Sequence, residues 1–285
     1  MNAVLELSKP RITQLVVLTA AGGYYMAVRG PFDLPRFGWT LVGTALVAAG
    51  TNALNQFRER HSDALMRRTR QRPLPSGRIT PRAALAFSVG AAGAGIGVLA
   101  WRVNALTAVL AALTLVSYAW VYTSLKPRTT YNTLVGAIPG ALPVLGGWTA
   151  AGGSLDPAAW VLFWILFLWQ LPHFLALAWM YREDYRSAGL AMLSIADPDG
   201  SRTARMTLLY AVALIPVSIL PAVYGVTGSL YFYGVLALSV GYAAAGAGML
   251  LQPAARELWA RRVFVASIVY LPALLTLGVL DKAGS

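Results

Sequence analysis

The sequence predicts an all-α polytopic membrane bundle of about nine transmembrane helices, each about 20 residues long. Its mean hydropathy is +0.59. Hydrophobic residues make up 57% of the chain and charged residues only 12%, against roughly 25% charged residues in soluble domains. The connections between apolar runs are too short for a separate globular domain, so we expect residues 1–285 to form a single membrane domain. The candidate spans cover residues 12–28, 38–57, 83–101, 104–122, 134–152, 158–180, 206–224, 230–251 and 262–280.

The segment before the first apolar run argues against a cleavable signal peptide. It carries Glu6, Lys9 and Pro10, and the run that follows is of spanning length. We therefore expect the first run to remain as a true span. The chain has no cysteine, which excludes disulfides, a thiolate metal site and covalent heme attachment through a C-x-x-C-H motif.

The net charge of +12 could suggest a nucleic-acid partner, but its distribution indicates membrane orientation instead. If the N-terminus is cytoplasmic and the spans alternate, every lysine and arginine is cytoplasmic except Arg29, Arg36, Arg102 and Lys282. The positive-inside rule predicts this asymmetry. We therefore expect no nucleic acid, a cell membrane location, cytoplasmic loops at 58–82 and 181–205, and a C-terminus outside.

The second apolar run continues into a polar segment, NQFRERHSDALMRRTRQRPLPSGR, from Asn55 to Arg78. Asn55, Glu59 and Asp63 are four residues apart, so they share one helical face, drifting by only about 40° per step. An amide oxygen and two carboxylates suit magnesium, which also binds phosphate oxygens. The arginines downstream would clamp an anion. The alternative is a polar helix end that merely leaves the bilayer.

A second polar constellation, WQLPHFLALAWMYREDYRSAG from Trp169 to Gly189, begins inside the sixth run. His173 follows Pro172 inside an apolar span, where an ionisable side chain is costly. Its spacing to Tyr181 and Asp184 predicts one shared helical face. Metal binding, proton relay and contact with a polar part of a substrate are open, as is a structural hydrogen bond to a neighbouring helix. Pro172 also favours an irregular helix that lines a cavity.

Lys126 and Arg128 follow the fourth run. They are either topology determinants or part of a ring of positive charge around a diphosphate. Together these patterns favour a lipidic diphosphate, with its head at magnesium and arginine on the cytoplasmic face and its tail between the helices. Metal and cations stabilise a departing diphosphate, and aromatic side chains can shield an allylic carbocation.

The Asn55 to Arg78 segment resembles the first signature of the UbiA-type intramembrane prenyltransferases. More narrowly, it is similar to the protoheme IX farnesyltransferase branch, which has glutamate where other branches usually carry aspartate, here Glu59. Similarity covers nearly the whole chain. The further motifs that carry it, in order along the chain, are S-K-P-R-I-T (8–13), L-K-P-R-T-T-Y-N (125–132), W-Q-L-P-H-F-L-A-L-A (169–178) and D-Y-R-S-A-G (184–189).

The resemblance implies a nine-helix UbiA-like fold whose cavity opens to the bilayer. It implies magnesium-assisted transfer of farnesyl from farnesyl diphosphate to a vinyl group of heme b, giving heme O, with heme A synthase or terminal oxidase assembly factors as partners. Magnesium–diphosphate would be bound by Asn55, Glu59 and Asp63, and a second acidic site by Asp184. The diphosphate would be held by Arg68, Arg72, Lys126 and Arg128. From the residues themselves, we also expect Tyr181 to contact substrate as an aromatic shield of the carbocation. We expect His173, which lies roughly 15 Å deeper than Asp184 by helical rise, to serve the acceptor.

The chain departs from the family pattern at two places. The family usually continues A-G-x-P-M-L-P, but this chain has Ala191 and Ser194 at the proline positions, which leaves the shape of that loop open. Tyr181 and Tyr185 stand near positions where quinone-type relatives carry aspartates, so direct metal binding by Asp184 is also open. Two other functions are a prenyltransferase for a quinone precursor or other aromatic acceptor and an ion-coupled transporter. The transporter predicts mid-helix polar residues, which are scarce beyond Gln170 and His173.

Overall fold

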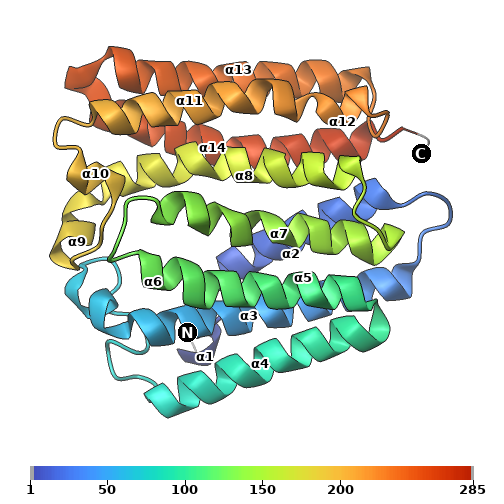
Figure 1. Ribbon diagram of the computed structural model, residues 1–285, viewed down its shortest axis with the longest axis horizontal. Helices are drawn as coiled ribbons and strands as arrows, with labels where there is room; N and C mark the ends of the chain where they lie inside the picture. Colours follow the sequence, from blue (N-terminus) through green and yellow to red (C-terminus); the bar gives the residue numbers. More distant parts are fainter. Residues whose placement is uncertain (1–2, 284–285) are drawn as a thin grey trace.

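The computed structural model describes residues 3–283, and its helices lie side by side in a bundle (Figure 1). Within these residues there is no β-strand, only an isolated bridge between Thr227 and Lys282. The predicted all-α class is therefore confirmed. The elements are α1 (Ala3–Leu7), α2 (Pro10–Ala27), α3 (Leu34–Leu65), α4 (Pro81–Arg102), α5 (Ala105–Val116), the π-helical segment η1 (Ser117–Tyr122), α6 (Thr123–Leu125), α7 (Asn132–Gly152), α8 (Pro157–Met180), α9 (Arg182–Ser187), α10 (Leu193–Ala196), α11 (Ser201–Ser218), α12 (Leu220–Val223), α13 (Ser229–Leu251), the 3₁₀ turn η2 (Pro253–Ala255) and α14 (Arg256–Leu280).

Eight helical stretches of the described chain are long and apolar enough to cross a membrane, so the protein is a multi-pass membrane protein. The first predicted span forms α2, an 18-residue helix that is not among the eight. Arg11 and Gln14 lower its hydropathy. With α2 added, the expectation of about nine helices holds approximately. The eight stretches are Leu34–Leu65, Pro81–Arg102, Ala105–Leu125, Asn132–Gly152, Pro157–Met180, Ser201–Val223, Ser229–Leu251 and Pro253–Leu280.

Several helices start at side-chain caps that the sequence supplies. Asp33 accepts a hydrogen bond from the backbone N–H of Arg36, and Asp156 accepts one from Ala159, at the starts of α3 and α8. Both helices have proline in the first turn, where its missing N–H costs nothing. Thr80 and Asn104 cap α4 and α5 in the same way.

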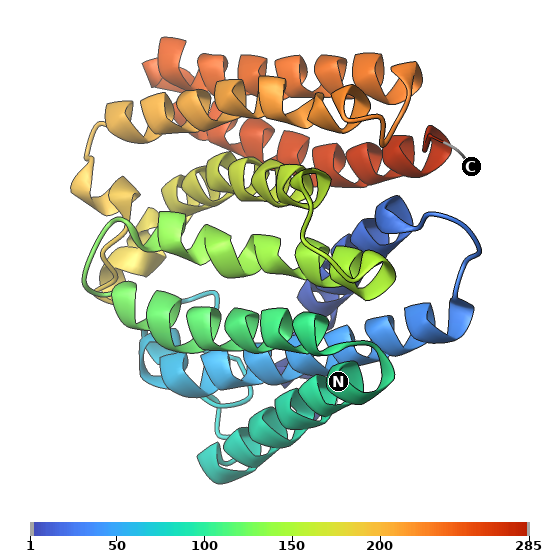
Figure 2. The ribbon, with the colours of Figure 1, turned by 45° about the vertical axis from the view of Figure 1, so that its right-hand side comes forward.

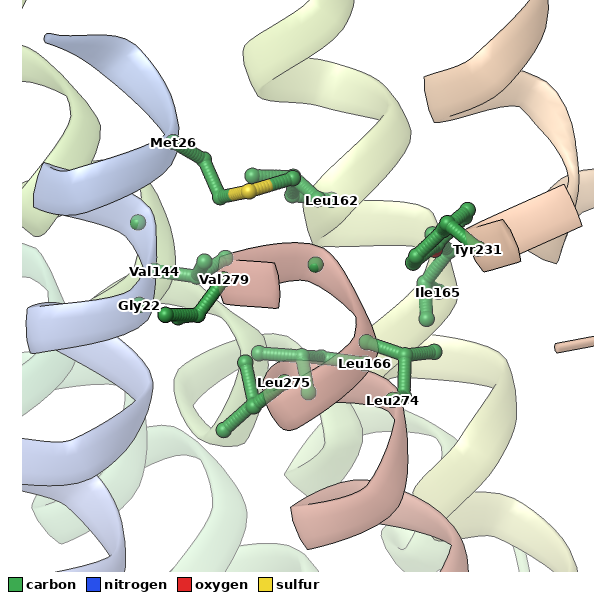
Figure 3. A pocket seen from close by; sticks show the side chains of 12 residues that line it. Gly22, Met26, Val144, Leu162, Ile165, Leu166, Tyr231, Leu274, Leu275 and Val279 are labelled. Carbon is green, nitrogen blue, oxygen red and sulfur yellow. The ribbon is translucent and has the colours of Figure 1, made fainter. Parts of the chain in front are cut away.

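Glycines let α2 lie directly against α7. A Cβ on Gly23 would lie 2.2 Å from the carbonyl oxygen of Val144, and one on Gly147 would lie 1.8 Å from that of Ala20. Small residues at such contacts allow helix backbones to approach closely in membranes. Beside this contact, α2 borders a small apolar cavity of about 20 Å³ that is also lined by α7, α8, α13 and α14 (Figure 3). That volume suits about one water molecule, so this cavity is not a substrate site.

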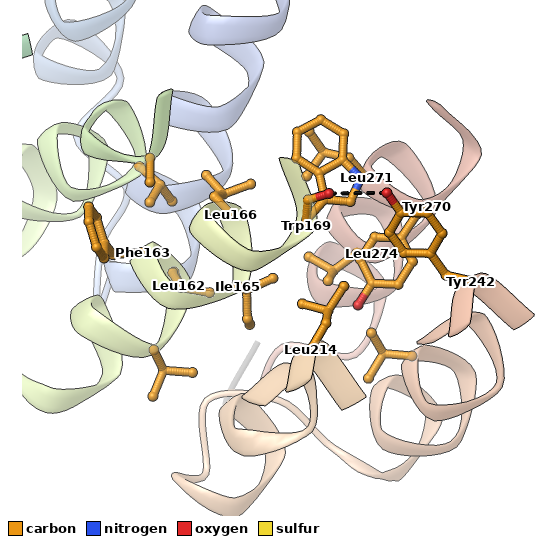
Figure 4. Packing of buried hydrophobic residues seen from close by; sticks show 14 of the residues in the cluster. Leu162, Phe163, Ile165, Leu166, Trp169, Leu214, Tyr242, Tyr270, Leu271 and Leu274 are labelled. Atoms are coloured by element: carbon orange, nitrogen blue, oxygen red, sulfur yellow. Dashed lines mark hydrogen bonds between the residues drawn. The ribbon is translucent and has the colours of Figure 1, made fainter. Parts of the chain in front are cut away.

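The core of the C-terminal half packs α8 against α11, α13 and α14 (Figure 4). The indole N–H of Trp169 donates to the carbonyl oxygen of Ser267 at 2.9 Å, and the Tyr242 hydroxyl donates to the carbonyl oxygen of Trp169 at 3.2 Å. These bonds fasten one turn of α8 to two neighbouring helices. The turn that follows, which carries His173, is therefore held in place.

The loops rich in charged residues gather at one end of the bundle, on the left in Figure 1, and Figure 2 shows the same grouping. This end holds the connections α3–α4, α6–α7 and α8–α11. One detail of the sequence prediction is wrong: α8 ends at Met180, and Tyr181 (φ −112°, ψ 24°) breaks it from α9. Tyr181 and Asp184 therefore do not continue the helical face of His173. The Arg182 side chain donates to the carbonyl oxygen of Trp179 at the broken end.

Candidate active site

The predicted row of oxygen ligands lies on one unbroken helix, α3. Asn55 and Asp63 are fully buried, and the Glu59 side chain is only 12% exposed. The row occupies the last three turns of α3, at the end of the bundle where the charged loops gather. Burial of two carboxylates requires compensating charges.

Each member of the row contacts a different cation. The Lys9 ammonium donates to Asn55 Oδ1 at 3.0 Å, and that of Lys126 lies 2.5 Å from Glu59 Oε1. The Arg72 guanidinium donates to both oxygens of Asp63, at 2.9 and 2.8 Å. The three cations come from the N-terminal segment, the α3–α4 loop and the α6–α7 connection. A row of oxygen ligands thus faces a row of cations from three distant segments.

Lys9 is a site residue that the sequence reasoning missed. It has the only positive φ among non-glycine residues of the described chain, at 47°. That conformation, directly before Pro10, turns α1 into α2 and brings the ammonium to an amide rather than a carboxylate. Burial, helped by the charge of Arg72, lowers the pKa of Lys9 to about 7. In the sequence, a Lys-Pro pair just before the first apolar run was the feature that could have pointed to Lys9.

Only one of the two predicted cations after α6 reaches the row. Burial disfavours the charge on Lys126, but the Glu59 carboxylate together with Tyr122 and Tyr118 outweighs burial and raises the pKa of Lys126 well above its ordinary value. Arg128 is exposed and forms no salt bridge with any residue in 3–283. The structure therefore joins Lys126 to the acids and leaves Arg128 at the surface.

The two acidic segments meet through Arg68. Its backbone N–H donates to Asp184 Oδ2 at 3.3 Å, and its guanidinium lies 4.7 Å from the Tyr181 ring centre and bonds the Tyr185 hydroxyl at 3.2 Å. Ser187 also donates to the carbonyl oxygen of Leu65 at 3.1 Å. Helix α9 is thus fastened to the end of α3. Residues 3–283 contain no group of three or more His, Cys, Asp or Glu side chains placed to hold a metal, so Asp184 and the α3 carboxylates do not form one ready cluster.

A π-helical segment, η1, lies against the α3 row. The Arg58 guanidinium donates to the carbonyl oxygen of Ala119 and, at 3.0 Å, to Ser124 Oγ. Asn55 Nδ2 donates to Thr123 Oγ1 at 3.3 Å. Such wide turns recur at functional sites. This one precedes Lys126, and no proline or glycine in residues 117–122 marks it in advance.

The two departures from the family pattern form specific hydrogen bonds. The backbone N–H of Ala191 donates to the carbonyl oxygen of Lys126 at 2.8 Å, a bond that proline could not make. Ser194 Oγ donates to the carbonyl oxygen of Ala178 at 2.8 Å. Asn132 Nδ2 donates to the carbonyl oxygen of Ala191, also at 2.8 Å. The loop after α9 is therefore docked on the Lys126 segment.

A cavity of about 470 Å³ lies within the bundle, and its lining stops short of the three row residues. Asn52, less than one helical turn before Asn55, lines it, as do Tyr118 and residues of α2, α5, α7, α8 and α14. The lining also includes exposed apolar residues of α2 and α14, so the cavity opens between these two helices. These residues are Ile12, Leu15, Ile268 and Pro272.

His173 lines the same cavity. Its Nδ1 lies 2.7 Å from Ser267 Oγ on α14, and its ring lies between Trp169 and Phe264, with centres 5.8 and 4.9 Å away. His173 therefore forms a hydrogen bond to a neighbouring helix and also lines the cavity, so the structural and the functional interpretations do not exclude each other. Pro172 does not break α8, which is continuous to Met180.

A second, open cleft of about 580 Å³ lies beside the row at the charged end. Arg68, Arg72 and Arg78 line it, and the Arg78 guanidinium pairs with both oxygens of Glu6 at 2.7 and 2.9 Å. Arg72 thus contacts Asp63 while lining a cleft open to solvent.

Arg58 provides a test of how η1 is held. Arg58→Ala is expected to lower kcat/KM on the order of tenfold, because the Ala119 carbonyl and the turn leading to Lys126 lose their charged donor. Arg58→Lys should recover part of the loss, since an ammonium can still reach one acceptor. Steady-state kinetics of both variants check this. Equal activity of Arg58→Ala and wild type would show that η1 does not need this contact.

Comparison with known proteins places these features in a family. A family model described as the UbiA prenyltransferase family matches residues 16–268. The chain is 45% identical to a protoheme IX farnesyltransferase of Solibacter usitatus, with all of both chains covered. It is 42% identical to the protein of that name from Myxococcus xanthus, covering 98% of this chain and 94% of that one.

Solved structures show the same fold. A digeranylgeranylglyceryl phosphate synthase superposes with a TM-score of 0.82 at 18% identity, covering 98% of this chain and 97% of that one. A UbiA homologue of Archaeoglobus fulgidus, bound to DMAPP and Mg²⁺, superposes with a TM-score of 0.68 at 15% identity, covering 94% and 99%. At these identities the likeness concerns the fold alone. From the family model and the relatives above 40% identity, the chain belongs to the UbiA prenyltransferase family.

Proposed function

We propose that this protein is a protoheme IX farnesyltransferase that joins the farnesyl group of farnesyl diphosphate to a vinyl group of heme b. The observation that carries the reaction type is the α3 row of oxygen ligands, faced by Lys9, Lys126 and Arg72, less than one helical turn from Asn52 in the wall of an apolar cavity. The acceptor is inferred from relatives of that name that match the whole chain.

The donor set on α3 fits magnesium. An amide oxygen and two carboxylates are hard ligands, and magnesium usually binds through one or two carboxylates together with substrate phosphates. Asn55, Glu59 and Asp63 would hold the ion, which when bound neutralises charge on the departing diphosphate. Asp184 would serve a second acidic position beside Arg68.

The cations of the site would change partners when the diphosphate binds. Lys126 and Arg72 now neutralise the α3 carboxylates, and Lys9 donates to the amide oxygen of Asn55. With the oxygens turned to the metal, the same three cations would bind phosphate oxygens, and Arg68 would join them from the adjacent cleft. Charge-assisted bonds of this kind favour the leaving group as its charge grows.

The prenyl chain would lie in the cavity, where apolar and aromatic side chains exclude bulk water. Trp169 and Phe174 line it and offer ring faces to an allylic cation. His173 belongs to the acceptor side of the site, since it lines the cavity from α8 and contacts none of the α3 row.

The direct test supplies purified protein with heme b, farnesyl diphosphate and magnesium, and follows the extracted pigment by mass. The expected result is a heme that has gained a farnesyl group, with inorganic diphosphate released. In parallel, an aromatic quinone precursor replaces heme b. Farnesylation of that acceptor, with heme b unchanged, would favour the alternative acceptor class instead.

Orientation in the membrane is tested on a chain without cysteine. Ser76 and Ser154 are both exposed, in the α3–α4 and α7–α8 connections at opposite ends of the bundle. With the active site cytoplasmic, Ser76→Cys should react with an impermeant thiol reagent only in inverted vesicles, and Ser154→Cys only in intact cells. The reverse pattern would contradict a cytoplasmic active site, and labelling of both from one side would contradict the crossing pattern.

A further inference from the structure

Two hydrogen-bond acceptors face the cavity from neighbouring turns of α8. Gln170 and His173 are three residues apart, so their side chains lie on the same helical face, roughly 5–6 Å apart at Cβ. Both line the cavity of about 470 Å³. One polar atom of each side chain already forms hydrogen bonds within the protein. The remaining polar atom of each side chain is therefore the one available to a ligand in the cavity.

The amide of Gln170 has one orientation. Its Nε2 donates to the carbonyl oxygens of Ala137 and Leu166 at 2.9 and 3.0 Å. Turning the amide over would place Oε1 against those two acceptors. Oε1 instead faces Gly140, where a Cβ would lie only 2.1 Å from it, and it accepts no hydrogen bond from any described residue. Gly140 also lines the cavity.

The tautomer of His173 follows from its partner. Ser267 Oγ donates its only hydrogen to the carbonyl oxygen of Phe264 at 2.5 Å. We therefore assign the same Oγ, 2.7 Å from His173 Nδ1, as the acceptor of that hydrogen bond. The proton then lies on Nδ1, and Nε2 carries a lone pair. The ring cannot easily turn over, because it lies between Trp169 and Phe264.

We propose that Gln170 Oε1 and His173 Nε2 together hold the water molecule that ends the reaction. This rests on the proposed transfer of farnesyl to a vinyl group. When the farnesyl carbon–oxygen bond breaks, its electron pair leaves with the diphosphate. The π electrons of the vinyl group then bond its outer carbon to the farnesyl carbon. A cation remains on the inner vinyl carbon, beside the macrocycle.

That cation can be discharged in two ways. It can lose a proton from a neighbouring carbon and give an alkene, or take the oxygen of a water molecule and give an alcohol. Two acceptors on α8 bind both hydrogens of one water and leave its oxygen lone pairs toward the cavity. As the carbon–oxygen bond forms, the released proton passes to His173 Nε2, so atoms and charge balance.

The test is the ratio of alcohol to alkene among farnesylated products, measured by mass in ¹⁸O-labelled water. Wild-type protein is expected to give the alcohol with one ¹⁸O. Gln170→Leu keeps the side-chain size but loses the acceptor, and should lower the alcohol-to-alkene ratio on the order of tenfold. A residue with a purely structural role would change the rate but not this ratio.

Gly140→Ala gives a second variant if Gln170→Leu does not fold. Its added methyl group displaces Oε1 without removing the amide, and it should also raise the share of alkene. An alkene product from wild type, or an unchanged ratio in the folded variants, would overturn the water site. Failure of wild type to farnesylate heme b at all would instead overturn the proposed function.

Discussion

Replacing Asp63 with asparagine is expected to reduce turnover on the order of a thousandfold. Asp63 is fully buried and holds Arg72 through both carboxylate oxygens. The amide keeps the shape but removes the negative charge that would bind the metal ion. It also leaves the Arg72 guanidinium facing an N–H group. The measurement is diphosphate release under saturating substrates.

The matched control for this variant is Asp33→Asn. Asp33 lies at the other end of the same helix, where it caps α3 through the N–H of Arg36, and asparagine caps helices equally well. Its activity should stay near wild type. Thermal unfolding in detergent should show both variants folded. Full activity of a folded Asp63→Asn protein would show that Asp63 does not bind the metal ion.

Lys126→Met is expected to lower kcat/KM for farnesyl diphosphate by about a hundredfold to a thousandfold. The substitution leaves the buried Glu59 carboxylate without its partner. It also removes one of the cations that we propose bind the diphosphate. The loss should appear largely in kcat, because charge on the leaving group grows toward the transition state.

Arg128→Met separates the two cations of the same segment. Arg128 is exposed and is not joined to the acids, so its loss should be at least about tenfold smaller than that of Lys126→Met. Equal losses of kcat/KM in the two variants would contradict the distinction between Lys126 and Arg128. Arg128 would then contribute to the site as much as Lys126 does. Steady-state kinetics of both variants decide between these outcomes.

Local periodicity was sufficient for the features confined to one helix. The spacing of Asn55, Glu59 and Asp63 predicted a row on one face, and α3 carries all three. The long charged loops were expected on one side of the membrane from charge and alternation alone, and they do gather at one end of the bundle. The first inference needs only the periodicity of one helix. The second needs only the number of spans and the charges of the loops between them.

Features that depend on contacts between distant segments could not be predicted in this way. Lys9 reaches Asn55 only because a left-handed residue turns α1 into α2. The wide turn of η1 is stabilised by Arg58, which is far away in the sequence. The break at Tyr181 separates Asp184 from the face of His173, and the docking of α9 on Arg68 accompanies that break. In each case tertiary contacts override the local helical pattern.

The most direct measurement is the binding of farnesyl diphosphate to the wild-type protein as magnesium is varied, without heme b. If Asn55, Glu59 and Asp63 hold the ion and release their three cations to the phosphates, affinity should rise with magnesium by at least about tenfold, and Asp63→Asn should abolish that rise. Tight binding that is equal with magnesium and with a chelator would contradict the metal site on α3.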